Sequence, residues 1–200
     1  METISITATV PQRNTAANRS PRWEENTVAS RPSRSSLPGS TSPSSAKPGR
    51  RLDRPNGSGR TTSTPDVRPT LIALRSAGLR IGIAGNQTVC ARNILQSMDL
   101  PSDMIATSDD WGASKPDPAF FDHVAASTPY GPKEILYVGD RLDNDIRPAV
   151  SRGLQTALIR RGPWEVIQQA DPDAGRIPTM RIDTLTELPS RIAAINSGSR

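Results

Sequence analysis

The sequence predicts an α/β fold with a parallel sheet, and three observations support that prediction. From Asp66 onward, short apolar runs of strand length alternate with segments whose apolar residues recur at helical spacing. Glycine and proline residues mark the boundaries between them. Strands that alternate with helices imply right-handed crossovers and a parallel sheet covered on both faces. We therefore expect a folded domain over residues 66–196 and a flexible end at 197–200.

The strands are predicted from apolar runs that turn residues bound on either side. These runs are 80–85, 104–107, 135–139, 155–159 and 180–182. The clearest buried strand is Ile-Leu-Tyr-Val-Gly at 135–139, and Asp140 stands at its carboxyl end.

Helices are predicted between and after these strands, because apolar residues return every three or four positions. We expect them at 69–77 with Gly78 as a stop, at 87–98, after a polar loop at 108–118, from the Asp140 loop to about Arg152, and near the C-terminus. The residues expected to face the core are Leu71, Leu74, Ala91, Ile94, Leu95, Met98, Phe121, Val124, Ala125, Ile146, Ala149, Val150, Leu185, Leu188, Ile192 and Ile195.

The first 65 residues differ from the rest in composition. Serine, threonine, proline and arginine predominate there, and few side chains are apolar. Such a segment cannot offset the backbone entropy lost on folding, so we expect a long disordered tail over residues 1–65. Alternation of apolar residues at Ile4–Val10 is typical of a strand, but the run ends at Pro11 and has no evident partner.

The charge of the chain divides at the same boundary. The net charge is +5, and residues 1–67 account for all of it, with ten Lys or Arg against five Asp or Glu. Two interpretations of this basic segment stay open: contact with nucleic acid or another anionic partner, or a solvated linker. No aromatic residue interleaves with Arg50, Arg51, Arg54 and Arg60 to stack on bases, so nucleic acid is the less favoured partner.

Composition excludes several classes of protein. No apolar run approaches the roughly 20 residues that span a bilayer, and the N-terminus does not resemble a secretory signal, so we expect a cytoplasmic protein without a membrane partner. Cys90 is the only cysteine, which excludes an internal disulfide and a cysteine-based zinc site. His123 is the only histidine, and we assign it no role. Any catalytic or binding chemistry is therefore expected to depend on carboxylates, lysine and backbone groups.

Three loops follow the carboxyl ends of predicted strands, which is where open parallel sheets bind their ligands. They carry Gly85-Asn86, then Lys115 in a Ser-Lys-Pro-Asp-Pro turn, then Asp140 with Asp145. Backbone N–H groups of a strand-to-helix turn bind anionic oxygens, lysine neutralises them, and paired carboxylates hold a hard cation such as Mg²⁺. This combination indicates phosphoryl chemistry. Alone, the two aspartates would also suit a helix cap and a first-turn acid.

Together these residues resemble the haloacid dehalogenase-like (HAD) hydrolase superfamily. Asn86 after an apolar strand resembles its second motif, Lys115 before Phe120-Phe121 its third, and Gly139-Asp140 followed by Asp145 its fourth. The order and intervals fit over residues 66–194. The resemblance implies a Rossmann-like core, usually with a helical cap. Most members are Mg²⁺-dependent phosphatases that work through an aspartyl-phosphate, and some are dehalogenases.

The resemblance also implies a role for each residue. Lys115 would be catalytic, stabilising charge on the nucleophile and on the transferring phosphoryl group. Asp140 would bind Mg²⁺, and Asp145 would assist directly or through water. Gly85 and Asn86 would bind phosphate through their backbone N–H groups, because Gly85 stands where the family normally has a hydroxyl residue.

The first motif of the family is the main departure. It is an Asp-x-Asp-x-Thr or Val turn that directly follows a buried N-terminal strand and supplies the nucleophile. No such strand and turn occur here; the nearest match, Asp66–Thr70, has Arg68 in place of the second aspartate and no apolar strand before it. We reject Asp66 as nucleophile, because covalent catalysis needs a carboxylate held rigidly at a strand end. We therefore expect a HAD core that is incomplete at its N-terminal strand.

Three functional hypotheses follow. The first is a phosphatase-type hydrolase, acting with Mg²⁺ on a small phosphorylated molecule and impaired because the nucleophile motif is missing. The second is a truncated or degenerate hydrolase that binds at most phosphate and Mg²⁺. The third is binding of nucleic acid or an anionic partner through the basic tail.

Overall fold

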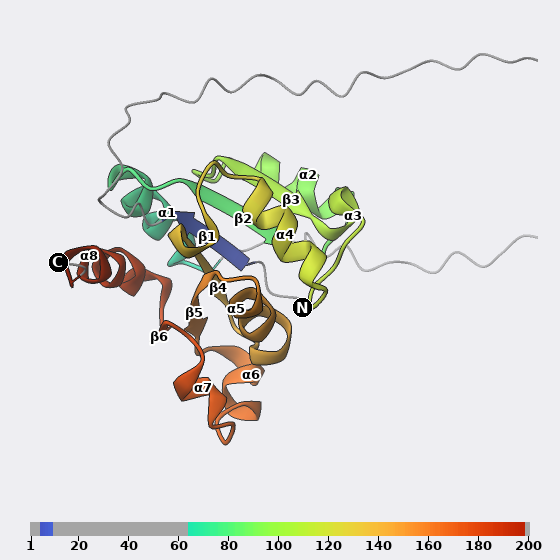
Figure 1. Ribbon diagram of the computed structural model, residues 1–200. Helices are drawn as coiled ribbons and strands as arrows, with labels where there is room; N and C mark the ends of the chain where they lie inside the picture. Colours follow the sequence, from blue (N-terminus) through green and yellow to red (C-terminus); the bar gives the residue numbers. More distant parts are fainter. Residues whose placement is uncertain (1–4, 10–63, 199–200) are drawn as a thin grey trace, which may run out of the picture. The chain divides into compact units, whose positions relative to one another are not determined.

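A six-stranded sheet forms the centre of the fold, in the order β3-β2-β1-β4-β5-β6 (Figure 1). The computed structural model describes residues 5–9 and 64–198, all of which belong to one unit of the chain. The strands are β1 (Ser5–Thr9), β2 (Ile81–Gly85), β3 (Met104–Thr107), β4 (Ile135–Gly139), β5 (Gln155–Ile159) and β6 (Met180–Ile182). All five predicted strands are therefore confirmed, and only β2 differs, beginning one residue late.

Five of the six strands run in the same direction. β3 pairs with β2 in parallel, and so do β5 with β4 and β6 with β5. β2 and β4 both run antiparallel to β1, so they are parallel to each other. The predicted α/β fold with a parallel sheet is confirmed. The carboxyl ends of β2 and β4 lie at one edge of the sheet.

β1 corrects two expectations, a tail disordered throughout residues 1–65 and a sheet without its central strand. Ile6 lies opposite Ile83 of β2 and Val138 of β4, and the side chain of Ala8 is fully buried. An open position between two strands presents unpaired N–H and C=O groups on both sides, and a short segment of strand character can satisfy them. The sequence near residues 5–9 does not indicate that β2 and β4 would be the partners of this strand. Residues 1–4 and 10–63 of the basic segment lie outside the described residues.

The helices connect the strands and follow them. They are α1 (Val67–Ser76), α2 (Val89–Ser97), α3 (Ser108–Trp111), α4 (Pro118–Ala126), α5 (Arg147–Ser151), α6 (Gly162–Ile167), α7 (Asp173–Arg176) and α8 (Leu188–Gly198). A π-helical turn, Leu142–Ile146, precedes α5, and 3-10 turns span Pro132–Glu134 and Leu185–Glu187. Sequence patterns did not predict α3, α6 and α7, which are too short to show a helical period. α8 includes Ser197 and Gly198, where we expected a flexible end.

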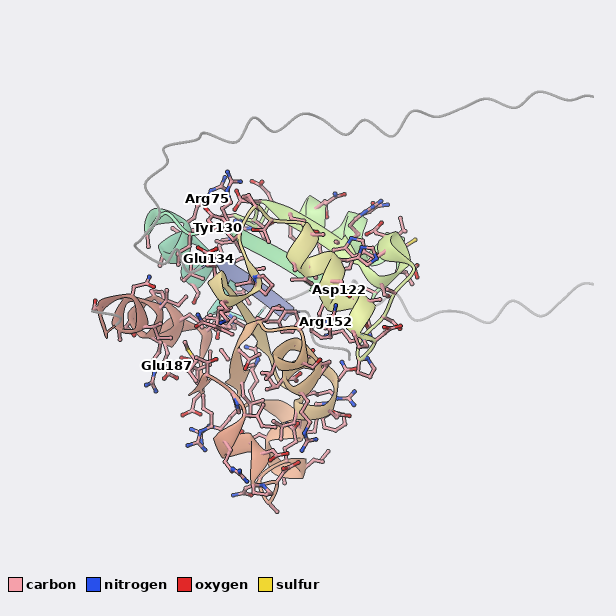
Figure 2. The ribbon with its side chains drawn as sticks, viewed as in Figure 1. Arg75, Asp122, Tyr130, Glu134, Arg152 and Glu187 are labelled. Carbon is pink, nitrogen blue, oxygen red and sulfur yellow. The ribbon has the colours of Figure 1, made fainter. Side chains whose placement is uncertain are left out.

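Apolar side chains cover both faces of the sheet. One cluster joins α1 and α8 to the sheet through Leu71, Leu74, Leu188 and Ile192. A second cluster joins α4 and α5 to the opposite face and includes Phe120, Phe121, Val124, Tyr137 and Ala149. On that second face, Asp122 of α4 and Arg152 after α5 form an ion pair of 2.5 Å (Figure 2). Two predicted core positions are wrong, because Ile94 is 48% exposed and Val150 is 39% exposed.

Local signals fix the helix ends nearest to the ligand-binding edge. Thr88 caps α2, where its hydroxyl accepts a hydrogen bond from the N–H of Ala91. Asp117 caps α4 and is followed by Pro118 in the first turn, where a missing N–H costs nothing. These caps place the loops after β2 and β3. No helix in the described ranges has the length and apolar character needed to cross a membrane.

Candidate active site

The loops after β2 and β3 are joined by a side-chain amide. Asn86 follows β2, and its Oδ1 accepts a hydrogen bond of 2.7 Å from the backbone N–H of Lys115. Its Nδ2 donates to the backbone carbonyl of Lys115 at 2.9 Å. The amide group therefore binds both polar groups of one peptide residue, as a neighbouring strand would. This arrangement fixes the backbone from which the Lys115 side chain extends.

Lys115 and Asp145 form a buried ion pair. Lys115 Nζ lies 2.7 Å from Asp145 Oδ1, and the exposed fractions of the two side chains are 2% and 1%. Desolvation makes such a pair a poor source of net stability, whereas removal of one partner leaves a charge buried in a medium of low polarity. The pair therefore holds the ammonium group rigidly beside the strand ends.

The turn after β4 holds the other oxygen of the Asp145 carboxylate. Asp145 Oδ2 accepts a hydrogen bond of 3.1 Å from the backbone N–H of Arg141. Gly139, the last residue of β4, makes room for this side chain, since a Cβ at that position would lie 2.4 Å from the Cβ of Asp145. A glycine at the strand end is therefore required by the close approach of the carboxylate.

Gln168 supports the same turn from outside it. Its Nε2 donates to the carbonyl of Asp140 at 2.8 Å, and its Oε1 accepts from the N–H of Leu142. Gln168 directly follows α6 and reaches over the start of the turn. Asp140, a buried residue that is only 6% exposed, therefore lies between the end of β4 and a turn that Gln168 holds in place.

Arg141 lies at the rim of the site. Its guanidinium group stacks on the ring of Trp164 with 4.0 Å to the ring centroid and binds both carboxylate oxygens of Asp143. The hydrogen bond from Arg141 holds the pKa of Asp143 below its usual value, and the same bond raises the pKa of Arg141. Asp140 and Asp145 also raise the pKa of Arg141 electrostatically, so the guanidinium lies within the field of the site.

Asp66, the rejected nucleophile, has a different environment. It precedes α1, and its Oδ2 accepts a hydrogen bond of 3.1 Å from the N–H of Leu185 and lies 3.6 Å from Arg161. Burial opposes its ionisation, but the hydrogen bonds from Thr64 and Leu185 and the charge of Arg161 keep its pKa below the usual value. These contacts tie α1 to the segments that follow β5 and β6.

Trp111, at the end of α3, packs against two aromatic residues of α4. Trp111 contacts the edge of Phe120 at 5.0 Å between centroids and stacks on the exposed His123 at 5.5 Å. Trp111 therefore packs against the apolar cluster of α4 and the sheet.

The predicted site residues meet at the carboxyl edge of the sheet. Asn86, Lys115 and Asp145 are linked by hydrogen bonds, Asp140 belongs to the same turn as Asp145, and Gly85 ends β2. Sequence reasoning missed the support that Gly139, Arg141 and Gln168 provide. Gly139 carries a signal, since it is a glycine directly before an aspartate at a strand end, but Gln168 belongs to a segment with no pattern of its own.

The side chains of the site fit a bound Mg²⁺ ion only in part. Asp140 supplies one carboxylate at the strand end, while both oxygens of Asp145 already bind Lys115 and the N–H of Arg141. Within residues 5–9 and 64–198, no three His, Cys, Asp or Glu side chains gather closely enough to hold a metal ion. Mg²⁺ usually keeps several waters and uses one or two carboxylates together with phosphate oxygens. Asp140 with a bound phosphate meets that minimum.

The order of the sheet and the position of the loops define a Rossmann-like α/β domain with its ligand-binding loops at the carboxyl ends of parallel strands. A family model described as haloacid dehalogenase-like hydrolase matches residues 23–152, which is more than half of the chain. The chain therefore belongs to the haloacid dehalogenase-like hydrolases.

Phosphatases are among the similar proteins. A glyceraldehyde 3-phosphate phosphatase of Methanopyrus kandleri is 35% identical over 127 residues, covering 62% of this chain and 54% of the relative. A ribulose-1,5-bisphosphate 5-phosphatase of Halopiger xanaduensis is 33% identical over 137 residues, covering 64% of this chain and 56% of the relative. This chain thus spans about half the length of these curated relatives.

Solved structures agree with the assignment of the fold. The crystal structure of a HAD phosphatase from Thermococcus onnurineus superposes with a TM-score of 0.54 at 30% identity, covering 64% of this chain and 57% of that chain.

Proposed function

We propose that this chain is the phosphate-binding core of a HAD phosphatase and that its own turnover of substrate is impaired. The observation that carries the proposal is the buried Lys115–Asp145 pair, which Asn86 and the turn after β4 hold at the edge where such sheets bind ligands. The proposed ligand is a small phosphorylated molecule, because the similar proteins are named for phosphatases of such compounds. The proposed location is the cytoplasm.

Each residue of the site has a proposed role in binding phosphate. Lys115 supplies a positive charge at a fixed position, because Asp145 and Asn86 hold both ends of the residue. The backbone N–H groups of Gly85 and Asn86 lie in a strand-to-helix turn, which suits anionic oxygens. Asp140 would hold Mg²⁺ together with the phosphate, and Asp145 would contribute indirectly by orienting Lys115. Bound Mg²⁺ would neutralise charge on the phosphoryl oxygens.

The direction of β1 supports the impaired turnover. In a strand parallel to β2 and β4, the residue after the carboxyl end would lie next to Lys115. β1 runs the other way, so Ser5 pairs with Ala84 near the site edge and Thr9 pairs with Ile135 at the opposite edge. The carboxyl end of β1, at Thr9, therefore lies at the edge of the sheet opposite the site. Asp66 is bound to Leu185 and Arg161 instead.

Titration calorimetry with inorganic phosphate, with and without Mg²⁺, tests the binding. We expect measurable binding that Mg²⁺ strengthens, and at least about tenfold weaker binding in Asp140→Asn, which removes one charge without changing the shape of the side chain. Asp143→Asn is the matched control, because it makes the same change in the same turn at a side chain that is 57% exposed. Absence of phosphate binding to the unmodified chain would contradict the proposal.

Hydrolysis of an aryl phosphate tests the second part of the proposal. We expect turnover by the unmodified chain to be absent or orders of magnitude below ordinary enzyme rates of about 1–1,000 per second. Rapid Mg²⁺-dependent turnover that Asp140→Asn abolishes would show that the chain has a nucleophile and would contradict the proposal that its turnover is impaired.

A further inference from the structure

A pocket lies where α6 and α7 approach β5 and β6. Its volume is about 290 Å³, and residues of all four elements line it. This volume is close to the lower end of the range of about 300–1,000 Å³ that is usual for small-molecule sites. None of Asn86, Lys115 and Asp145 lines the pocket. It therefore has room for a small molecule and is separate from the proposed phosphate site.

The pairing of β5 with β6 places two arginine side chains on the same face of the sheet. Arg181 of β6 lies directly opposite Leu158 of β5, and opposed residues point to the same face. Arg160 lies two residues after Leu158 and continues the ladder, since its N–H donates to the carbonyl of Ile182 at 2.8 Å. Leu158 is 3% exposed and packs with Ala174 of α7. All but Ile182 line the pocket, which therefore combines guanidinium groups with an apolar wall.

The charges around the pocket are of both signs. Arg160 is neutralised by Asp183, whose Oδ1 lies 2.5 Å from its guanidinium group. Arg181 extends beside α7, where its Nη1 would lie 3.6 Å from a Cβ added to Gly175. Glu165 lines the pocket from α6. In the described part of the chain, neither Arg181 nor Glu165 forms an ion pair. One positive and one negative charge thus face the pocket from different walls.

We propose that this pocket binds a small zwitterion with an aliphatic body, which is the chemistry of a free α-amino acid. Arg181 binds the carboxylate, Glu165 accepts hydrogen bonds from the ammonium group, and the aliphatic part packs on Leu158 and Ala174. A ligand with only one of these charges would displace water from the other charge of the pocket without replacing its hydrogen bonds. The pocket should therefore prefer a zwitterion to either singly charged analogue.

Gln168 connects this pocket to the turn after β4. It lines the pocket, and its side-chain amide binds the carbonyl of Asp140 and the N–H of Leu142. A ligand that bridges α6 and β6 therefore restrains the backbone that carries Asp140, and it should strengthen phosphate binding. This effect rests on the proposed function, whereas binding in the pocket does not.

Nuclear magnetic resonance titrations of the full-length chain test the proposal with three ligands. L-leucine carries both charges, isocaproate lacks the ammonium group, and isoamylamine lacks the carboxylate. We expect leucine to bind at least about tenfold more tightly than either analogue. It should shift the backbone amide signals of Gln169, which lines the pocket, and of Leu142, which binds Gln168.

Three variants assign the two charges. Glu165→Gln should bind leucine and isocaproate equally, because the partner of the ammonium group has lost its charge. Arg181→Gln should bind leucine and isoamylamine equally, for the corresponding reason. Arg176→Gln is the matched control, since this exposed arginine of α7 does not line the pocket. It should bind leucine as the unmodified chain does.

Several results would overturn the pocket as a zwitterion site. They are the absence of leucine binding, equal binding of the three ligands by the unmodified chain, and a loss of leucine binding in Arg176→Gln as large as that in Arg181→Gln. Tighter binding of isocaproate than of leucine would also overturn it.

Phosphate titrations with and without saturating leucine separate this inference from the proposed function. We expect leucine to tighten phosphate binding by about fivefold. Leucine binding that leaves phosphate binding unchanged supports the pocket and overturns its connection to the site through Gln168. Leucine binding by a chain that binds no phosphate supports the pocket and contradicts the proposed function.

Discussion

The ends of β2 and β4 differ from the end of β1 that lies beside them, although all three meet at the same edge of the sheet. β2 and β4 leave this edge through loops whose side chains hold one another, so that Asn86, Lys115 and Asp145 form one connected group. β1 enters at this edge with Ser5, because its direction is reversed. Occupying the right position in a sheet completes the core, but only the right direction delivers a residue to the site.

The largest effect should come from the buried ion pair on the side of β2 and β4. Lys115→Met leaves the buried carboxylate of Asp145 without its ammonium partner, and we expect the free energy of unfolding to fall by about 3–5 kcal/mol in urea titrations. Lys133→Met is the control, because that lysine is exposed and should change stability by less than about 0.5 kcal/mol. Similar small losses in both variants would show that the pair is not buried.

The second prediction concerns the contribution of β1. Ala8 has no exposed surface, and Ala8→Asp should lower the free energy of unfolding by about 2–3 kcal/mol, because the strand must either bury a charge or leave the sheet. Ala73→Asp, at an exposed position of α1, should cost well under 1 kcal/mol. If Ala8→Asp is as mild as this control in urea titrations, β1 does not occupy the centre of the sheet.

The third prediction tests the close approach at the end of β4. Gly139→Ala places a Cβ where it would overlap the Asp145 side chain, so we expect a loss of about 1–3 kcal/mol and a weaker response to phosphate. Gly131→Ala is the matched control, since its added Cβ would meet only Glu134 Oε2 at an ordinary 3.5 Å. A stable Gly139→Ala variant with normal phosphate binding would show that Asp145 is not packed on the strand end.

The smallest effect depends on pH and concerns Asp66, which lies outside the site. Because its pKa is lowered in the folded chain, its charge stabilises the fold above the pKa of the unfolded chain, about 3.9, and this contribution is lost as the pH falls through the folded value. Asp66→Asn should therefore cost about 1 kcal/mol at pH 7 and nearly nothing near pH 2. Urea titrations at the two pH values measure the difference. If the loss in free energy of unfolding is the same at both pH values, the charge of Asp66 is not its cause.

Apolar patterning was enough to predict the parallel strands and the loops that follow them. Runs such as Ile135–Gly139 are buried on both faces, and buried strands are continuous in sequence. The helix faces were less well predicted, since Ile94 has the right spacing but lies on an exposed part of α2. Spacing identifies a face of a helix, but whether that face is covered depends on elements elsewhere in the chain.

The site was predicted as a set of residues and not as a set of contacts. Loops at strand ends bring Asn86, Lys115 and Asp145 together, as expected for a parallel sheet. The sequence predicted that Asp140 and Asp145 would bind Mg²⁺ together, whereas Asp145 forms an ion pair with Lys115. This pairing depends on the directions of the side chains, which the spacing of residues does not determine. The hydrogen bonds of Gln168 to the turn after β4 and the pairing of β1 with β2 and β4 are contacts between segments that are far apart in sequence. No local pattern predicts such contacts.

The direction of β1 is the central claim, and cross-strand nuclear Overhauser effects between backbone protons measure it most directly. We predict contacts that pair Ser5 with Ala84 and Thr9 with Ile135, which is the antiparallel register on both sides of the strand. Contacts that instead pair Ser5 with Ile81 and Thr9 with Gly139, or the absence of any contact from β1 to β2 and β4, would contradict this account.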